Sequence, residues 1–247
     1  MIPKIIHYCW FGGNALPPLA QKCIASWRKY FPDYEIKEWN EENFDITIID
    51  YVKEAYSAKQ YAFVSDYARF WILYNYGGVY FDTDVEVLRD IRDIVSQGAF
   101  MGCECDGGKV SNIAVNPGLG IASPKKHNIY CSFLDLYSNL HFINPNGSYN
   151  QTTIVDHITP VLIKNGLKNI SSIQVVDGIF IYPKEYFCPL DSITKKLDIT
   201  PNTRTIHHYT ASWYTRKHHL YRFVSRFLGN RMSHQISLLF KSLHIIK

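Results

Sequence analysis

Two aspartates, Asp82 and Asp84, stand two residues apart in the stretch VYFDTDVEV, residues 79–87. We expect this stretch to be a strand, on which alternate side chains share a face, so that Tyr80, Asp82 and Asp84 would lie together. Two adjacent ionised carboxylates repel each other unless a cation lies between them, and their hard oxygen atoms suit Mg²⁺ or Mn²⁺. The spacing therefore predicts a divalent metal site, although two solvated acids in a surface loop would have the same spacing.

The segment before the acids, residues 56–76, has its apolar residues at helical spacing, and Gly77-Gly78 supplies a C-terminal stop. Asp66 and Arg69 lie on another face of this expected helix. A binding role explains their spacing, and so does an ordinary surface ion pair.

Strand and helix patterns alternate along the rest of the chain, which favours a sheet covered by helices. Residues 3–13, PKIIHYCWFGG, are typical of an apolar strand that ends in a Gly-Gly loop, and ligands of α/β folds bind at that end of a strand. A helix and a second strand are expected at residues 17–31 and 33–40. Further strands are expected at AFMGCE, LGIAS and IFIYP, and further helices at KHNIYCSFLDLYSNL and TIVDHITPVLIKNG.

Several of these features together resemble the signature of glycosyltransferase family 32, the DXD-containing sugar transferases that include the yeast initiating α-1,6-mannosyltransferase. The matching residues are Ala62, Asp66, Arg69, Leu73, Gly77, Gly78, Tyr80, Asp82 and Asp84. The glucosylating clostridial toxins are similar more distantly. The resemblance runs from IPKIIHYCWFGG near the start to HHYTASW at residues 207–213, and it is loose between about 85 and 200.

The resemblance implies an α/β fold of the GT-A type, a single domain with a mixed, mostly parallel sheet flanked by helices. We expect that domain to span residues 1–215 and a basic amphipathic helical tail to span residues 216–247.

The resemblance also implies a sugar-nucleotide site with a bound Mn²⁺ or Mg²⁺. Its metal ligands would be Asp82, Asp84 and His208. Trp10 would be a platform for the nucleobase, and Asp66 and Arg69 would contact the ribose and the sugar. Tyr80 would line the nucleotide site, Asp82 would contact the ribose as well as the metal, and Trp213 would close on the diphosphate.

The reaction implied is a transfer with retention of configuration, in which the departing phosphate oxygen can take the acceptor's proton and no strong base is needed. Asp82 and Asp84 would act in catalysis through the metal. Gln151, ahead of an expected helix, would lie under the sugar, although an N-terminal cap explains polar residues there equally well. We expect His7, inside the first strand, to be structural.

Composition limits the class of protein. The 247 residues are 47% apolar and 15% aromatic, enough for one large domain. No apolar run approaches the roughly 18 residues of a membrane span, and the first residues do not resemble a signal peptide, so we expect a cytoplasmic protein. The six cysteines contain no C-x-x-C pair, which favours reduced thiols over a zinc or redox motif.

The basic charge lies in the tail. Residues 213–247 contain seven Lys or Arg and no acid, with apolar residues on another face of the expected helix. This pattern is typical of a helix that lies at an anionic membrane surface, and equally of one that packs on the domain. Nucleic acid is not expected as a partner, because no recognition module is present.

The expected function is therefore transfer of a sugar from a nucleotide donor, a UDP-sugar in preference to GDP-mannose, to an oligosaccharide or lipid-linked glycan in bacterial capsule, O-antigen or other surface polysaccharide synthesis. Two alternatives remain at this point. One is a non-catalytic module that binds glycan or sugar nucleotide. The other is a phosphatase of the haloacid-dehalogenase type, whose first Asp is a nucleophile, although its later G-D-x-x-x-D motif is missing here.

Overall fold

The computed structural model describes residues 1–108, 111–192 and 194–210. The predictions for Trp213 and for the tail at 216–247 lie outside the described residues. Within the described part, no helix combines the length and apolar character needed to cross a membrane.

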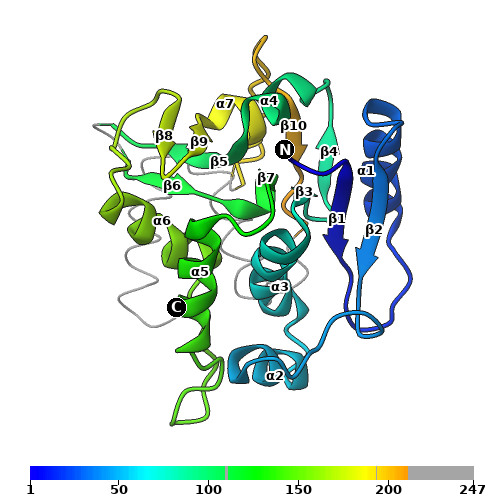
Figure 1. The fold of residues 1–247 in the computed structure, drawn as a ribbon, viewed down its shortest axis with the longest axis vertical. Coiled ribbons are helices and arrows are strands. Elements are labelled where there is room, and N and C mark those ends of the chain that lie inside the picture. Colours follow the sequence, from blue (N-terminus) through cyan, green and yellow to red (C-terminus); the bar gives the residue numbers. More distant parts are fainter. Residues whose placement is uncertain (109–110, 193, 211–247) are drawn as a thin grey trace.

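One mixed sheet forms the centre of the molecule (Figure 1). Its strands, in spatial order, are β2 (Glu35–Trp39), β1 (Ile5–Cys9), β3 (Gly78–Tyr80), β7 (Ile121–Ser123), β5 (Ala99–Asp106), β9 (Ile179–Tyr182) and β8 (Gln174–Val176), with β6 (Ile113–Val115) paired to β5. Strands β1, β2, β3, β5 and β9 run one way, and β6, β7 and β8 run the other. The predicted mixed, mostly parallel sheet is confirmed.

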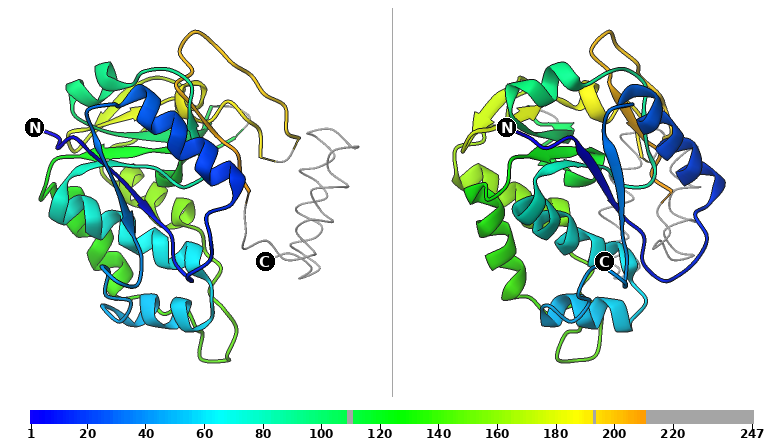
Figure 2. Two further views of the ribbon diagram at one scale, coloured as in Figure 1. Left: turned by 90° about the vertical axis from the view of Figure 1, so that its right-hand side faces the viewer. Right: turned by 45° about the vertical axis from the view of Figure 1, so that its right-hand side comes forward.

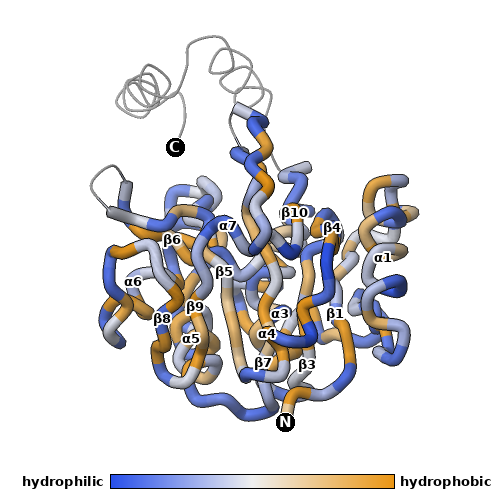
Figure 3. Tube along the Cα trace, turned by 90° about the horizontal axis from the view of Figure 1, so that it is seen from above, coloured by the Kyte–Doolittle hydropathy of each residue, from blue (hydrophilic) through white to orange (hydrophobic). Residues whose placement is uncertain are grey.

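Helices cover both faces of this sheet (Figures 1 and 2). One hydrophobic cluster joins the sheet to α2 (Asp50–Ser57), α3 (Tyr61–Tyr76), α5 (Asn128–Ser138) and α6 (Ile154–Lys164). The other joins it to α1 (Pro18–Tyr30), α4 (Arg92–Gln97) and α7 (Lys184–Phe187). Along α1 the trace in Figure 3 alternates between hydrophobic and hydrophilic colour, as expected of a helix with one face against a sheet.

The prediction of one strand over residues 79–87 is wrong. Strand β3 ends at Tyr80, and a second strand, β4 (Val85–Val87), leaves the main sheet to pair with β10 (Thr205–His207) in a small antiparallel sheet. The bond from Val85 N–H to the Asp82 carbonyl, 3.0 Å, closes a turn between them. Asp82 and Asp84 therefore lie in a turn at the carboxyl end of β3, and strand alternation does not bring them together.

The helix expected over residues 56–76 is also interrupted. Its first residues belong to α2, and the backbone turns at Lys59, which has a φ of 57°, before α3 begins at Tyr61. The turn that carries the acids thus follows α3 and β3, which are joined through Gly77 with a φ of 64°.

His7 is the middle residue of β1 and has no exposed surface. Its Nε2 is 2.9 Å from the Gly77 carbonyl, and its Nδ1 accepts a hydrogen bond of 3.0 Å from Trp39 Nε1. Both contacts are satisfied only by the neutral ring, with the proton on Nε2. Burial lowers the pKa of His7 to about 4, although the Gly77 carbonyl opposes the shift.

This pKa predicts a loss of stability in mild acid. Because the folded-state pKa lies below the unfolded value, His7 contributes its full stability above pH 6.5, and that contribution falls away as the pH drops towards 4, by about 3 kcal/mol. Urea unfolding across this range should show the loss in the native protein and a smaller one in His7→Gln. Parallel stability curves for the two proteins would contradict this account.

Candidate active site

A cavity of about 580 Å³ opens at the carboxyl ends of β1 and β3. Its walls come from the loop after β1, the starts of α1, α3 and α6, the turn after β3, and residues of β5 and β10. Asp66, Arg69, Asp82 and Asp84 all line it, so residues predicted from separate motifs meet in one place. A second hollow of about 540 Å³, around Lys125–Ile129, contains none of the predicted residues.

Arg69 links the helix to the acids. Its Nη2 is 2.8 Å from Asp66 Oδ1 and 3.1 Å from Asp82 Oδ1, and its Nη1 is 3.5 Å from Asp82 Oδ2. Asp66 is only 9% exposed and Arg69 only 3%, which excludes the surface ion pair considered from the sequence. Burial raises the pKa of both Asp66 and Asp82, while the attraction of Arg69 opposes the shift.

Asp82 is held from two further sides. The Tyr80 hydroxyl donates a bond of 3.1 Å to Asp82 Oδ1, and Tyr80 is itself fully buried and lies outside the cavity lining. The sequence led us to expect Tyr80 to line the nucleotide site. In the structure Tyr80 contacts Asp82 and positions it. On the other side, a Cβ on Gly118 would lie 2.3 Å from Asp82 Oδ2, so only glycine allows that close an approach.

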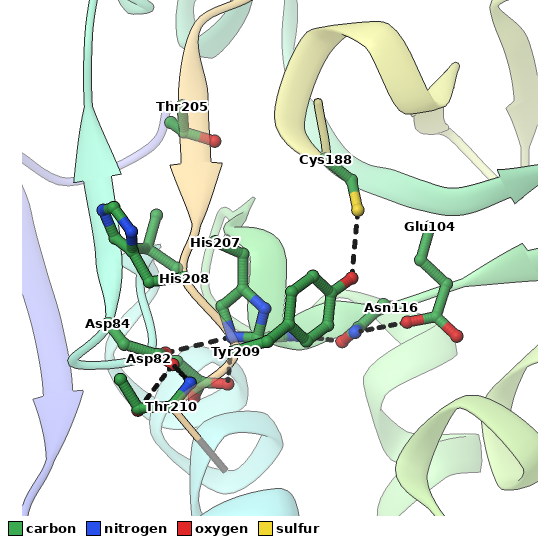
Figure 4. A network of polar contacts seen from close by, with 12 residues as sticks. Asp82, Asp84, Glu104, Asn116, Cys188, Thr205, His207, His208, Tyr209 and Thr210 are labelled. Atoms are coloured by element: carbon green, nitrogen blue, oxygen red, sulfur yellow. Dashed lines mark hydrogen bonds and ion pairs between the residues drawn. The ribbon is translucent and has the colours of Figure 1, made fainter. Parts of the chain in front are cut away.

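Asp84 is surrounded by hydrogen-bond donors (Figure 4). His207 Nε2 is 3.0 Å from Asp84 Oδ1, and the Thr210 N–H and hydroxyl each donate to Asp84 Oδ2 at 2.8 Å. Burial would raise the pKa of Asp84, but His207 and Thr210 outweigh it and hold the pKa well below its ordinary value. Burial would lower the pKa of His207, but Asp84 outweighs it and raises that pKa.

The structure brings His207, and not His208, to the acids. His207 Nε2 is also 4.0 Å from Asp82 Oδ2, whereas His208 Nε2 lies 2.9 Å from Glu86 Oε2 on the other side of the ribbon (Figure 4). The cause is strand alternation in β10 and just beyond it, which directs neighbouring side chains to opposite faces. The sequence-based assignment to His208 is therefore one residue away from the side chain that contacts the aspartates.

Of the other predicted site residues, Trp10 lines the cavity and Gln151 does not. The Nε1 of Trp10 donates to the Asn14 carbonyl at 2.6 Å. Gln151 lies two residues before Thr153, the N-cap of α6, and is not among the lining residues, to which this helix contributes Thr153, Ile154 and Val155. Four residues beside the acids were not predicted from the sequence: Glu104, Asn116, Gly118 and Thr210.

The donors at this site fit a divalent cation by their chemistry. The imidazole of His207 lies within 4.0 Å of both carboxylates, and Asp84 is kept ionised, as a ligand must be. In the described ranges, however, no three His, Cys, Asp or Glu side chains already stand in a metal-binding arrangement. An arriving ion would therefore have to replace the His207 and Thr210 contacts of Asp84.

Comparisons with known proteins agree with this geometry. The family model "Glycosyltransferase sugar-binding region containing DXD motif" matches residues 17–101. Inositol phosphoceramide mannosyltransferase 1 of Schizosaccharomyces pombe is 31% identical over 111 residues, which is 40% of this chain and 33% of that protein. The chain thus spans about a third of that relative's length.

Two wider similarities cover more of the chain. An uncharacterized glycosyltransferase of Acanthamoeba polyphaga mimivirus, L373, is 25% identical over 198 residues, 74% of each protein. The solved structure of the PaToxG glycosyltransferase superposes with a TM-score of 0.52 at 19% identity, over 66% of this chain and 69% of that one. The fold is of the GT-A type that the sequence led us to expect.

The Arg69 pairs predict a large effect on stability. Arg69→Gln should lower the free energy of unfolding by about 3 to 5 kcal/mol, because it leaves two buried carboxylates without their cation. Asp33→Asn, which breaks the exposed pair with Lys4, should leave the urea midpoint nearly unchanged. Urea unfolding at neutral pH compares them, and equally small effects would show that Arg69 does not neutralise the acids.

Proposed function

We propose that the chain is a DXD-containing sugar transferase related to glycosyltransferase family 32, and that it transfers a sugar from a nucleoside-diphosphate donor to a glycan acceptor with retention of configuration. The observation that carries this proposal is the meeting of Trp10, the Asp66–Arg69 pair and both acids in one cavity. An aromatic side chain can hold a base, and acids with a buried cation can hold the charged and hydroxylated parts of a donor.

Asp82, Asp84 and His207 would hold the Mn²⁺ or Mg²⁺ of this site. When bound, the ion supplies positive charge where negative charge develops on the departing diphosphate. Arg69 keeps Asp82 in place at 3.1 Å, and the low pKa of Asp84 keeps that carboxylate ionised at neutral pH.

The remaining lining residues hold the substrates and exclude water. Trp10 offers its ring to the nucleobase from the loop after β1, and Asp66 is placed to accept hydrogen bonds from donor hydroxyls. No side chain is required as a strong base, because the departing phosphate oxygen takes the proton of the attacking hydroxyl.

For the donor we propose a UDP-sugar, with GDP-mannose as the alternative favoured by the name of the S. pombe mannosyltransferase. For the acceptor we propose a glycan of a bacterial surface polysaccharide, free or lipid-linked, made in the cytoplasm at the membrane's inner face. The name of the same relative specifies a lipid, inositol phosphoceramide, which supports a lipid-borne acceptor.

A thermal-shift panel tests the donor. UDP-glucose, UDP-galactose, UDP-N-acetylglucosamine and GDP-mannose are compared with and without Mn²⁺, and one of them should raise the melting temperature only with the ion. Turnover of that donor should disappear in EDTA. Binding without any turnover would favour the non-catalytic module, and phosphate-ester hydrolysis without sugar transfer would favour the phosphatase.

The adjacent histidines provide a matched pair for the ion site. His207→Ala should lower Mn²⁺-dependent turnover about 100-fold, because it removes a group 3.0 Å from Asp84. His208→Ala should leave turnover within about twofold, because His208 contacts Glu86. Donor hydrolysis measured against Mn²⁺ concentration compares the two, and a loss confined to His208→Ala would overturn this assignment.

The basic tail yields a separate expectation. Removing residues 216–247 should lower binding to anionic vesicles and leave hydrolysis of the sugar nucleotide intact, because all seven Lys and Arg of residues 213–247 lie in the part removed. Co-sedimentation with phosphatidylglycerol vesicles measures this effect. Equal vesicle binding by the full-length and shortened proteins would contradict membrane contact through the tail.

A further inference from the structure

Glu104 is a carboxylate in the cavity wall that none of the sequence motifs includes. It lies on β5, and Asn116 Nδ2 donates a hydrogen bond of 2.8 Å to its Oε2 (Figure 4). Within the described ranges this is its one hydrogen bond, and no Lys or Arg forms an ion pair with it. Because Glu104 lines the cavity and a carboxylate has about four acceptor sites, it has capacity for further hydrogen-bond donors.

The backbone of β5 is adapted at this residue. In the antiparallel pairing with β6, Cys103 lies opposite Val115, but Cys105 lies opposite Ala114, so the register shifts by one residue at Glu104. Such a bulge leaves one residue without a cross-strand partner and redirects its side chain, and bulges are frequent beside active sites. The residue at this register shift is thus the one that lines the cavity.

Asn116 fixes this carboxylate relative to the two aspartates. Its Oδ1 accepts a bond of 2.8 Å from Gly118 N–H, which orients the amide so that Nδ2 faces Glu104. A Cβ on Gly118 would lie 2.3 Å from Asp82 Oδ2 and 3.0 Å from Asn116 Oδ1, so the amide and Asp82 adjoin the same point. Glu104 is thus held one side chain away from the acids.

The charge of Glu104 limits what it can bind. Burial raises the pKa of its carboxyl, since Asn116 compensates the charge only in part. A phosphate group would be repelled there, whereas hydroxyl groups donate hydrogen bonds to a carboxylate, and two neighbouring hydroxyls of a hexose can bind both oxygens.

We propose that Glu104 accepts hydrogen bonds from the hydroxyl groups of the donor's sugar ring and thereby determines which hexose the enzyme transfers, with Asn116 as its positioning residue. This inference rests on the proposed function and assigns a part of the same cavity. It predicts that the carboxylate distinguishes a sugar nucleotide from the bare nucleoside diphosphate.

The experiment compares Glu104→Gln with the native protein. The probes are UDP or GDP and the hexose conjugate selected by the thermal-shift panel, titrated calorimetrically with Mn²⁺. Glutamine keeps an oxygen for Asn116 but loses the charge. The variant should bind the bare diphosphate within about twofold of native and the conjugate at least about tenfold more weakly.

Asp106→Asn is the matched control. Asp106 lies two residues further along β5, bonds to Lys184 N–H and to the Ser171 hydroxyl, and is not a lining residue. It should leave both affinities unchanged. If Glu104→Gln also leaves the affinity for the conjugate unchanged, or impairs only transfer to the acceptor, the assignment to the donor sugar is overturned.

Monodeoxy analogues of the same donor identify the hydroxyl groups. At least one analogue should bind native protein about tenfold more weakly than the parent donor and should bind Glu104→Gln no worse than the parent does. Equal penalties in both proteins would overturn the proposal. If the native protein bound neither UDP nor GDP in the presence of Mn²⁺, that result would instead contradict the proposed function itself.

Discussion

One buried cation holds this site together. Arg69 projects from α3 between Asp66 and Asp82, and its 2.8 and 3.1 Å contacts join a helix to the turn that follows β3. Three carboxylates converge in a poorly hydrated place, and without a fixed positive charge their repulsion would open it. Tyr80 and Gly118 contact or closely approach Asp82 from two further sides, so this acid is held by residues of α3, β3 and the turn after β6.

Part of this architecture follows from the sequence and part does not. Local periodicity predicted β1, α1 and the residues Asp66 and Arg69 of α3, because such patterns depend on neighbours a few positions away. It failed at residues 79–87, where β4 leaves the sheet to pair with β10, a partner more than 110 residues distant. The same pairing decides that His207 faces Asp84 while His208 faces Glu86.

Glu104 and Asn116 were missed for a related reason. The amino-acid sequence of β5 does not show that its register shifts at Glu104, because the shift is defined only by the pairing with β6. The family resemblance does not identify them either, because it is loose between about residues 85 and 200. Glu104 and His207 are cavity residues that could not be predicted because pairing with another strand sets their direction.

The ribbon of β4 and β10 also has a consequence for how the protein is made. Val85 and His207 are paired in register, so the acid turn is completed by a segment synthesised more than 120 residues later. Most of the sheet and the Asp66–Arg69 ion pair of α3 can form on the ribosome before that segment emerges, since domains begin to fold during synthesis. Through that interval Asp84 has neither His207 nor Thr210 beside it, and the late closure of so distant a contact makes the acid-lined end of the cavity one of the last parts to form.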